Sequence, residues 1–497
     1  MNRMDVLKKG LAVFMAAVLS VGAGGAVYAQ NTSQPVGTLA MDTRSYQMAP
    51  GNIYDFRATV SGSGLDQSKI KVYSSRDGIA KVSRVAGTDK YRITGLQEGV
   101  SYVIAEINGV HASVKVTVQK GVSPKGEACR SVSIVGANAQ VTEAEMRAVW
   151  IPYMSLDMSS SADQSAAAFQ KKFDGLVAQA KRNGMNTLIV HVRPFGDSLY
   201  PSGYFPWSHL LTGTQGKAPG YDPLAYMVQA THNAGMKFHA WVNPMRISLK
   251  GVPTALSADN PYTKWSGDSQ KNNWTMEWEG AKYYNPGVAQ VRSHIVSGIE
   301  EIVKNYSVDG VQFDDYFYPT QAASIDSVSY QASGTTLSVA DWRKQNINSL
   351  VSQVYSSIKK IKPGVVFGIS PQASIQNDLN MGADVYTWGS QPGYVDYICP
   401  QMYVNSQHTG MPFDSTAVTW RQLVKNPNVK LYFGLALYKA GSAVDGGTWQ
   451  NSNSILADQI QKGRSLGTDG FMLYSSAYLE HDQTRAEMNS IRQLLGV

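Results

Sequence analysis

Cysteine is nearly absent from this 497-residue sequence, which contains it only at Cys129 and Cys399. Two cysteines are too few for a disulfide-rich scaffold or a four-cysteine zinc site. The eight histidines are scattered, and no His-Glu-x-x-His motif occurs among them. We therefore expect two free thiols, with a single disulfide between them as the alternative, and neither a metal nor a cofactor.

Charged residues are also few, at 16%, and Lys and Arg form no run that suggests nucleic-acid binding. Hydrophobic residues, at 43%, give an ordinary globular composition. The net charge of +7 is small for a chain of this length. It is compatible with an unspecific solvated surface or with an anionic cell-wall polymer as partner.

The apolar stretch Leu11–Val21 is too short and too rich in Gly and Ala to span a membrane. Basic residues precede it, and Val27-Tyr28-Ala29 follows it as a candidate cleavage site. This pattern is typical of a secretory signal peptide, here residues 1–29. No cysteine follows the apolar core, so a lipid anchor is not expected. We expect a secreted mature chain in the cell wall or periplasm, with no stable membrane span after signal removal.

Residues 36–119 are typical of a small all-β domain, because short alternating runs such as Ile70–Tyr73 and Tyr102–Ala105 are separated by Gly- and Ser-containing turns. The runs Ile79–Val82, Ile93–Leu96 and Val114–Val118 resemble the bacterial Ig-like module of surface proteins, which implies an Ig-like β-sandwich that acts as a spacer or wall-binding unit. Residues 120–145 are rich in Gly, Ser and Ala, and we interpret them as a linker.

From residue 146 to 497 predicted strands alternate with predicted helices, which indicates a parallel sheet. Eight βα units in this length predict an α/β fold of the (β/α)₈ TIM-barrel type, with a doubly wound open sheet as the alternative. The predicted strands are Ala148–Ile151, Thr187–Arg193, Lys237–Asn243, Gly310–Asp315, Val365–Ser370, Tyr397–Tyr403, Lys430–Leu437 and Gly470–Tyr474. The clearest predicted helices are Ala166–Asn183, Pro223–Gly235, Val288–Asn305, Val339–Ile361 and Ser454–Gly467.

The fourth predicted strand ends in two adjacent acids, Asp314 and Asp315, followed by aromatic residues. Paired carboxyl groups beside aromatic platforms are typical of sugar-cleaving sites. Alternate residues of a barrel strand point inward. Because Gln312 and Asp314 share one parity, and Val311 and Phe313 the other, we expect Asp314 to point into the barrel mouth and Asp315 to lie at its rim.

Polar and aromatic side chains also follow the other predicted strands. Buried polar groups cost free energy when unpaired, so their repetition at one end of the barrel indicates a polar ligand. Mutual ion pairs, such as one between Arg193 and Asp197, are the alternative for any single pair. The residues expected to bind the ligand are Arg193, Asp197, Trp241, Asn243, Arg246, Asn285, Tyr316, Gln401, Tyr403 and Tyr474.

A long loop, residues 247–285, follows the third predicted strand and carries five aromatic residues: Trp265, Trp274, Trp278, Tyr283 and Tyr284. A loop of this length is usually functional. Its aromatic rings have two interpretations of equal weight, stacking on sugar rings or packing a small core of the loop itself.

Eight motifs in order resemble the bacterial glycosyl-hydrolase-like family ten. They are RAVW at 147–150, VRPFGD at 192–197, PWS at 206–208, LTG at 211–213, HAWVNP at 239–244, DGVQFDDYFYP at 309–319, GISP at 368–371 and VDYICPQMY at 395–403. The resemblance implies a (β/α)₈ barrel, an exported location and glycosidase activity, in some members on peptidoglycan strands stripped of peptides. The chain departs from the family after the fifth strand, at residues 372–377, and at His209, where some relatives have Glu.

A glycosidase needs one ionised and one protonated carboxyl group. We expect Asp314 to be the ionised member, as nucleophile or base. Asp384 is the first candidate for the proton donor, although it could instead cap a helix. Asp315, Asp197 and Glu480 are the further candidates. No cofactor is required, and the expected partner is a polysaccharide. The competing hypotheses are a barrel that only binds wall glycans and a polysaccharide deacetylase, which normally needs a His/Asp metal site.

Overall fold

The computed structural model describes residues 37–62, 66–107, 110–128, 132–134 and 145–497. The predicted signal peptide, Cys129 and most of the predicted linker lie outside these residues. Cys399 is a buried free thiol, as expected. No helix within the described part of the chain is long and apolar enough to cross a membrane. The same residues contain no cluster of three or more His, Cys, Asp or Glu side chains able to hold a metal ion.

The amino-terminal domain consists of two five-stranded sheets, in the orders β10-β1-β3-β6-β5 and β4-β7-β8-β2-β9. Side chains from both sheets, such as Phe56 of β3 and Val114 of β8, share one buried core. The strands are β1 Gly37–Met41, β2 Thr43–Met48, β3 Ile53–Gly62, β4 Lys71–Ser74, β5 Ala80–Arg84, β6 Lys90–Gly95, β7 Gly99–Ile107, β8 Val110–Val118, β9 Lys125–Ala128 and β10 Val132–Ile134, with a short 3-10 helix η1 at Gln67–Lys69.

The all-β domain therefore extends beyond the predicted boundary at residue 119. β9 pairs with β2 and β10 pairs with β1, both antiparallel. The described part of the predicted linker thus supplies two edge strands, because unpaired backbone groups of β1 and β2 are satisfied by the chain that follows.

Eight parallel strands of the second domain close into a barrel, which confirms the predicted fold. The ring is closed where β11 pairs with β22 and where β19 pairs with β21. In ring order the strands are β11 Met146–Ile151, β12 Thr187–Arg193, β13 Lys237–Val242, β17 Gly310–Phe313, β18 Val366–Ile369, β19 Tyr397–Ile398 with β20 Gln401–Met402, β21 Lys430–Leu435 and β22 Gly470–Leu473.

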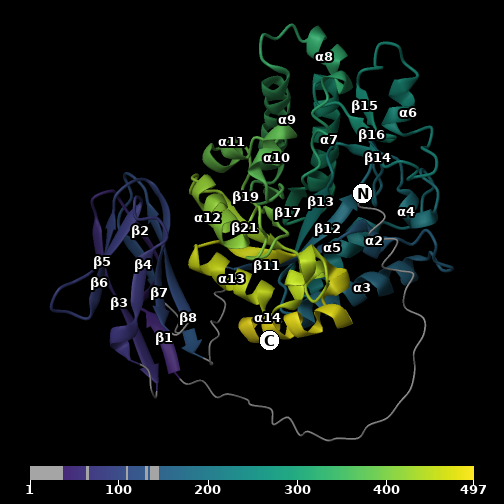
Figure 1. Ribbon diagram of the computed structural model, residues 1–497. Helices are drawn as coiled ribbons and strands as arrows, with labels where there is room; N and C mark the ends of the chain where they lie inside the picture. Colours follow the sequence, from purple (N-terminus) through teal and green to yellow (C-terminus); the bar gives the residue numbers. More distant parts are fainter. Residues whose placement is uncertain (1–36, 63–65, 108–109, 129–131, 135–144) are drawn as a thin grey trace, which may run out of the picture. The chain divides into compact units, whose positions relative to one another are not determined.

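Helices surround this barrel (Figure 1). The α-helices are α2 Tyr153–Leu156, α3 Ala166–Arg182, α4 His209–Thr212, α5 Pro223–Asn233, α6 Pro261–Ser266, α7 Ala289–Asn305, α8 Ser327–Ala332, α9 Val339–Ile361, α10 Ile375–Asn380, α11 Val385–Ser390, α12 Phe413–Leu423, α13 Ile455–Ser465 and α14 Arg485–Leu495. Short 3-10 helices lie at η2 Ala323–Ile325, η3 Leu437–Lys439, η4 Asp445–Gln450, η5 Ser476–Tyr478 and η6 Asp482–Thr484.

Six predicted strands end one or two residues earlier in the structure than predicted, and the differences in the sixth and the fourth bear on the site. The sixth is broken into β19 and β20 around Cys399-Pro400, because proline has no N–H to donate to a neighbouring strand. The fourth, β17, ends at Phe313, so Asp314 and Asp315 follow the strand. Both carboxyl groups therefore lie on the segment that leaves the barrel.

The loop after β13 folds into a three-stranded sheet of β14 Arg246–Ser248, β15 Thr275–Trp278 and β16 Ala281–Tyr284. Its aromatic rings pack on one another and on α7: the ring centroid of Trp265 lies 5.1 Å from that of Trp274 and 5.1 Å from that of His294. These contacts support the interpretation that the loop builds its own small core.

The barrel interior is filled by large aromatic side chains opposite glycines. Trp150, Trp241, Tyr397 and Tyr432 share one buried cluster there. A Cβ atom on Gly368 would lie 2.1 Å from the ring of Tyr397, so only glycine leaves room for that ring. Above this layer the polar residues of the strand ends begin.

Candidate active site

Asp314 lies inside the barrel mouth, as its parity predicts. Gln312, of the same parity, accepts a 2.8 Å hydrogen bond from Nε1 of Trp150 in the interior, whereas Val311 and Phe313 belong to the outer core under the helices. Asp314 is only 3% exposed. Its Oδ2 accepts a 3.0 Å hydrogen bond from Nε1 of Trp241 at the end of β13.

Burial raises the pKa of the Asp314 carboxyl to about 7. The positive charge of Arg246 and the hydrogen bond from Trp241 oppose this shift, while the charge of Asp315 adds to it. Near neutral pH Asp314 therefore keeps its proton far more readily than an exposed carboxyl group does. A carboxyl group that keeps its proton near neutral pH is suited to act as a proton donor. The structure therefore favours this role for Asp314, whereas the sequence led us to expect the ionised role.

Asp315 is half-buried and turns toward the other side of the mouth. Its Oδ1 accepts a 2.8 Å hydrogen bond from Nε2 of Gln401, which begins β20. The same Nε2 lies 3.1 Å from the carbonyl oxygen of Ser370 after β18. The two neighbouring carboxyl groups are thus directed to different strands, Asp314 to β13 and Asp315 to β20.

His191 supports Trp241 from the adjacent strand β12. Their rings stack with centroids 3.7 Å apart and planes within 7°. Burial, with the charges of Arg246 and Arg193, lowers the pKa of His191 well below its ordinary value, so the ring is neutral. Both ring nitrogens are buried without a hydrogen-bond partner among the described residues. The stack holds the indole in the orientation that reaches Asp314.

Arg246 places a positive charge at the same mouth. Its guanidinium lies 5.0 Å from the ring centroid of Phe195 and 4.9 Å from that of Tyr316, and Nε donates to the carbonyl oxygen of Pro194 at 3.0 Å. Asn243 stabilises the turn that leads to Arg246, since Oδ1 of Asn243 accepts a hydrogen bond from the backbone N–H of Arg246 at 2.9 Å. Tyr316 is 42% exposed. A ring and a guanidinium are therefore presented together beside Asp314.

Tyrosines from the last strands complete the mouth. The ring centroid of Tyr474 lies 5.8 Å from that of Tyr403 and 6.5 Å from that of Trp241. Tyr438 packs on both tyrosines. Burial raises the pKa of Tyr474, as does the nearness of Tyr316. Neutral hydroxyl groups on aromatic faces suit a ligand that both stacks and hydrogen-bonds.

Arg193 does not point into the mouth. A β-bulge after His191 sets both Val192 and Arg193 opposite Val242, which reverses the expected parity of Arg193. Its guanidinium lies 4.3 Å from the ring centroid of Phe205, on the α7 side of the barrel wall, fully buried. The expectation that it contacts the ligand is therefore not supported by its placement.

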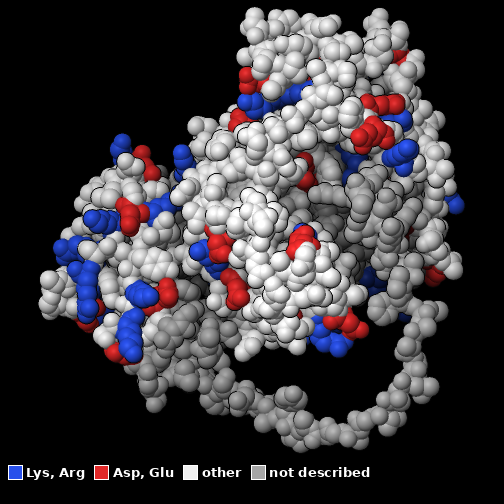
Figure 2. Space-filling model, viewed as in Figure 1, with Lys and Arg blue, Asp and Glu red and all other residues white. Residues whose placement is uncertain are grey.

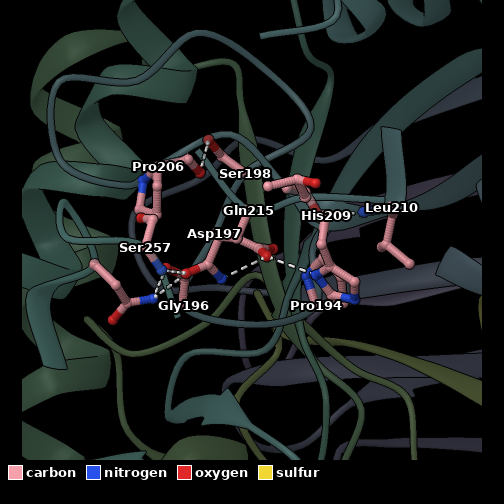
Figure 3. Close-up of polar contacts among 12 residues, drawn as sticks. Pro194, Gly196, Asp197, Ser198, Pro206, His209, Leu210, Gln215 and Ser257 are labelled. Atoms are coloured by element: carbon pink, nitrogen blue, oxygen red, sulfur yellow. Dashed lines mark hydrogen bonds and ion pairs between the residues drawn. The ribbon is translucent and has the colours of Figure 1, made fainter. Parts of the chain in front are cut away.

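Asp197 is likewise buried and lies in the loop that follows β12 (Figure 3). Its Oδ2 lies 2.9 Å from Nδ1 of His209 and accepts from Nε2 of Gln215 at 2.9 Å. Gln215 in turn accepts from the backbone N–H of Ser257, so the network ties two loops together. Asp197 and Arg193 form no ion pair.

Three other candidates lie away from the mouth residues. Asp384 is the N-cap of α11, where it accepts from Thr387 and from Nδ2 of Asn348 at 2.9 Å. This is the capping role weighed as its alternative. Glu480 is paired with Arg182 at 3.0 Å. Asn285 is buried in the β14–β16 insertion, where its Nδ2 donates to Ser329 and to Asn273.

One acid near the site was missed by the sequence reasoning. Asp378 of α10 is 2% exposed, and its Oδ1 accepts from the backbone N–H of Gln372 at 2.9 Å. Burial, with the charge of Asp315, raises its pKa well above the ordinary value. Asp378 therefore holds the loop after β18 through this hydrogen bond, while its burial favours the protonated acid. The only signal in the sequence was an acid shortly after the Gly-Ile-Ser-Pro motif.

Basic and acidic side chains are interspersed on the face in Figure 2. The functional groups at the barrel mouth are two carboxyl groups, one guanidinium and several surrounding aromatic side chains. A carboxyl group that titrates near neutrality beside a second one is able to act in acid–base catalysis.

Comparisons with known proteins identify the family of the chain. A family model described as Glycosyl hydrolase-like 10 matches residues 145–450. Glycosyl hydrolase YngK of Bacillus subtilis is 39% identical over 332 residues, which is 62% of this chain and 64% of that protein. Glycosyl hydrolase DigH of Escherichia coli is 32% identical over 399 residues, which is 72% of this chain and 89% of that protein.

Among solved structures, the glycoside hydrolase domain of PgaB from Bordetella bronchiseptica superimposes with a TM-score of 0.48 at 12% identity, over 70% of this chain and 99% of that domain. The family match covers more than half of the chain and includes every barrel strand from β11 to β21. The chain belongs to the Glycosyl hydrolase-like 10 family.

Proposed function

We propose that this protein is a secreted glycoside hydrolase that cleaves glycosidic bonds in a cell-wall polysaccharide. The observation that carries the proposal is Asp314, a carboxyl group buried at the barrel mouth whose pKa is raised to about 7 beside a second carboxyl group. Glycosidases require such a pair, with one member protonated at working pH.

In this proposal Asp314 donates its proton to the glycosidic oxygen as the bond from that oxygen to the anomeric carbon breaks. The carboxylate of Asp315 stabilises the positive charge that develops on the sugar ring, or activates the attacking water. Neighbours in sequence rarely flank a substrate, but here Trp241 and Gln401 hold the two groups toward different strands. Asp384, Asp197 and Glu480 are engaged elsewhere.

Peptide-free peptidoglycan strands are the substrate we infer. The resemblance of the motifs to division-associated members supports this choice. Each muramic residue of a stripped strand exposes a lactyl carboxylate, and Arg246 offers a guanidinium beside Asp314 to receive it. Tyr316, Tyr403 and Tyr474 provide ring faces for the sugars, and the predicted signal peptide would bring the chain to the wall.

The test is product analysis by mass spectrometry after incubation of the purified protein with naked peptidoglycan strands, chitin oligomers and neutral glucans. We expect new reducing ends from the first substrate and a loss of at least 100-fold in rate for Asp314→Asn. Glycan binding by Asp314→Asn should persist.

The same experiment separates the enzyme from a barrel that only binds glycans. A wild-type protein that binds the strands yet releases no fragment from any polysaccharide in the panel would contradict the proposed catalysis. The anomeric form of the first product, read by NMR, assigns the stereochemistry: carboxyl groups about 5 Å apart lead to retention and groups about 6.5–9.5 Å apart to inversion.

A further inference from the structure

One hollow on the barrel domain lies away from its mouth, along the outer face of α9. It has a volume of about 570 Å³ and is lined by α9, by Asp384 and by Tyr394. This volume falls in the range of about 300–1,000 Å³ typical of small-molecule sites. Asp384, one of the acids singled out by the sequence, lies here.

The lining of this groove is unusual for an exposed helix. Between Lys344 and Lys359 the helix α9 carries no charged side chain, and its groove side consists of amides and hydroxyls such as Gln345, Ser352 and Gln353. Exposed helix faces in globular proteins are normally rich in charged residues. The charges at the end of the groove, Asp341 and Lys344, neutralise each other at 2.8 Å.

The floor of the groove is rigid. Asn348 donates through Nδ2 to Oδ2 of Asp384 at 2.9 Å and accepts through Oδ1 from Nε1 of Trp388 at 2.7 Å. Oδ2 of Asp384 also accepts from the hydroxyl of Thr387 at 2.7 Å. These bonds join α9 to α11, so the groove is preformed and little conformational entropy is lost when a ligand enters.

We propose that this groove is a second glycan-binding site, which takes a segment of an uncharged oligosaccharide outside the catalytic mouth. Amide and hydroxyl side chains both donate and accept hydrogen bonds, as sugar hydroxyls do, and carry no charge that would favour an ionic ligand. Tyr394 is half-buried and offers a ring face at the edge. An apolar ligand is disfavoured because polar groups dominate the lining.

The experiment uses the full chain with Asp314→Asn, so that no oligosaccharide is cleaved. Binding of N-acetylglucosamine hexamer, cellohexaose and maltohexaose is measured by calorimetry, and bound segments are located by hydrogen–deuterium exchange. We expect at least one hexamer to slow exchange in residues 345–356. Adding Ser352→Arg, which fills the groove, or Tyr394→Ala, which removes a ring without adding bulk, should weaken that binding at least fivefold.

Ser415→Arg on α12 is the control, since it places the same side chain on a helix at an exposed position that does not line the groove. It should leave binding unchanged. The proposal is overturned if no hexamer protects residues 345–356, or if Ser352→Arg binds as tightly as its parent. Because cleavage is absent in every variant, this result is independent of whether the mouth hydrolyses glycans.

Discussion

The indole Nε1 of Trp241 in β13 donates a hydrogen bond of 3.0 Å to Oδ2 of Asp314, which directly follows the neighbouring strand β17. This bond stabilises the ionised carboxylate, while burial stabilises the protonated acid. Burial prevails, and the pKa of Asp314 is raised to about 7. The hydrogen bond therefore fixes the position of the candidate proton donor and limits how far burial raises its pKa.

Replacing Trp241 with Phe removes this donor but keeps a ring to stack on His191. The pKa of Asp314 should then rise further, by about one unit, because a bond to a charged acceptor is worth roughly 1.5–3 kcal/mol. In a pH–rate profile on the cleaved glycan, the alkaline limb of the Trp241→Phe enzyme should move upward by about that amount. Trp150→Phe, one layer deeper, controls for loss of a buried indole, and an unmoved limb in Trp241→Phe would contradict the assignment.

The stability of the barrel should also depend on pH through Asp314. Its pKa in the folded protein lies above its ordinary value of 3.8, so the folded state favours the proton and stability declines as pH rises from about 4 through 7. Asp314→Asn removes this cost. The variant should be more stable than the wild type at pH 8 by on the order of 2–4 kcal/mol and equal to it at pH 4.

Urea denaturation at pH 4, 6 and 8 measures this difference. Asp174→Asn serves as control, because Asp174 is exposed and its carboxyl only accepts from Tyr226 at the surface. If Asp314→Asn and wild type differ equally at all three pH values, the carboxyl does not titrate in this range.

Gln401 should influence the pH at which Asp315, the second carboxyl group, ionises. In Gln401→Glu a negative charge replaces the donor to Asp315, and like charges disfavour ionisation. The acid limb of kcat/KM should therefore shift to higher pH, by about one unit or more. Gln401→Met removes the donor without adding a charge, so it should lower the rate with a smaller shift. A profile in which Gln401→Glu retains the wild-type acid limb would assign the ionised role to a group other than Asp315.

Two glycines near β18 offer a comparison, Gly368 in the barrel interior and Gly364 in the exposed turn before the strand. Gly368→Ala places a methyl group 2.1 Å from the ring of Tyr397, so it should destabilise the barrel by about 3 kcal/mol through overpacking. Gly364→Ala, four residues earlier, meets no atom within 4 Å and should be nearly neutral. Thermal unfolding of both variants compares them directly. Equal midpoints would contradict the prediction, because they would mean that the barrel interior rearranges to accommodate the added methyl group.

The order and type of the barrel elements were accessible from the sequence because they rest on local pattern. α9 spans Val339–Ile361 and β12 spans Thr187–Arg193, both as predicted from periodicity and flanking residues. The inward direction of Asp314 followed from the parity of Gln312 and Val311. For such features each residue's immediate neighbours carry the information.

Placement that depends on distant partners was not accessible in this way. A single bulge turned Arg193 out of the mouth, and Asn348 of α9, far along the chain, engaged Asp384 at the start of α11. Asp378 of α10 is buried and accepts a hydrogen bond from the backbone of Gln372, which no local pattern indicated.

The sequence by itself determined a barrel of eight βα units and the acid that points into it, since strand parity and helical period are properties of adjacent residues. Only the tertiary structure decided which carboxyl groups share the mouth and which of them holds a proton. The reason is physical, because a pKa depends on burial and on charges and hydrogen bonds within a few ångströms. For Asp314 the nearby charges are those of Arg246 and Asp315, and Trp241 donates a hydrogen bond. Trp241 and Arg246 come from another part of the chain.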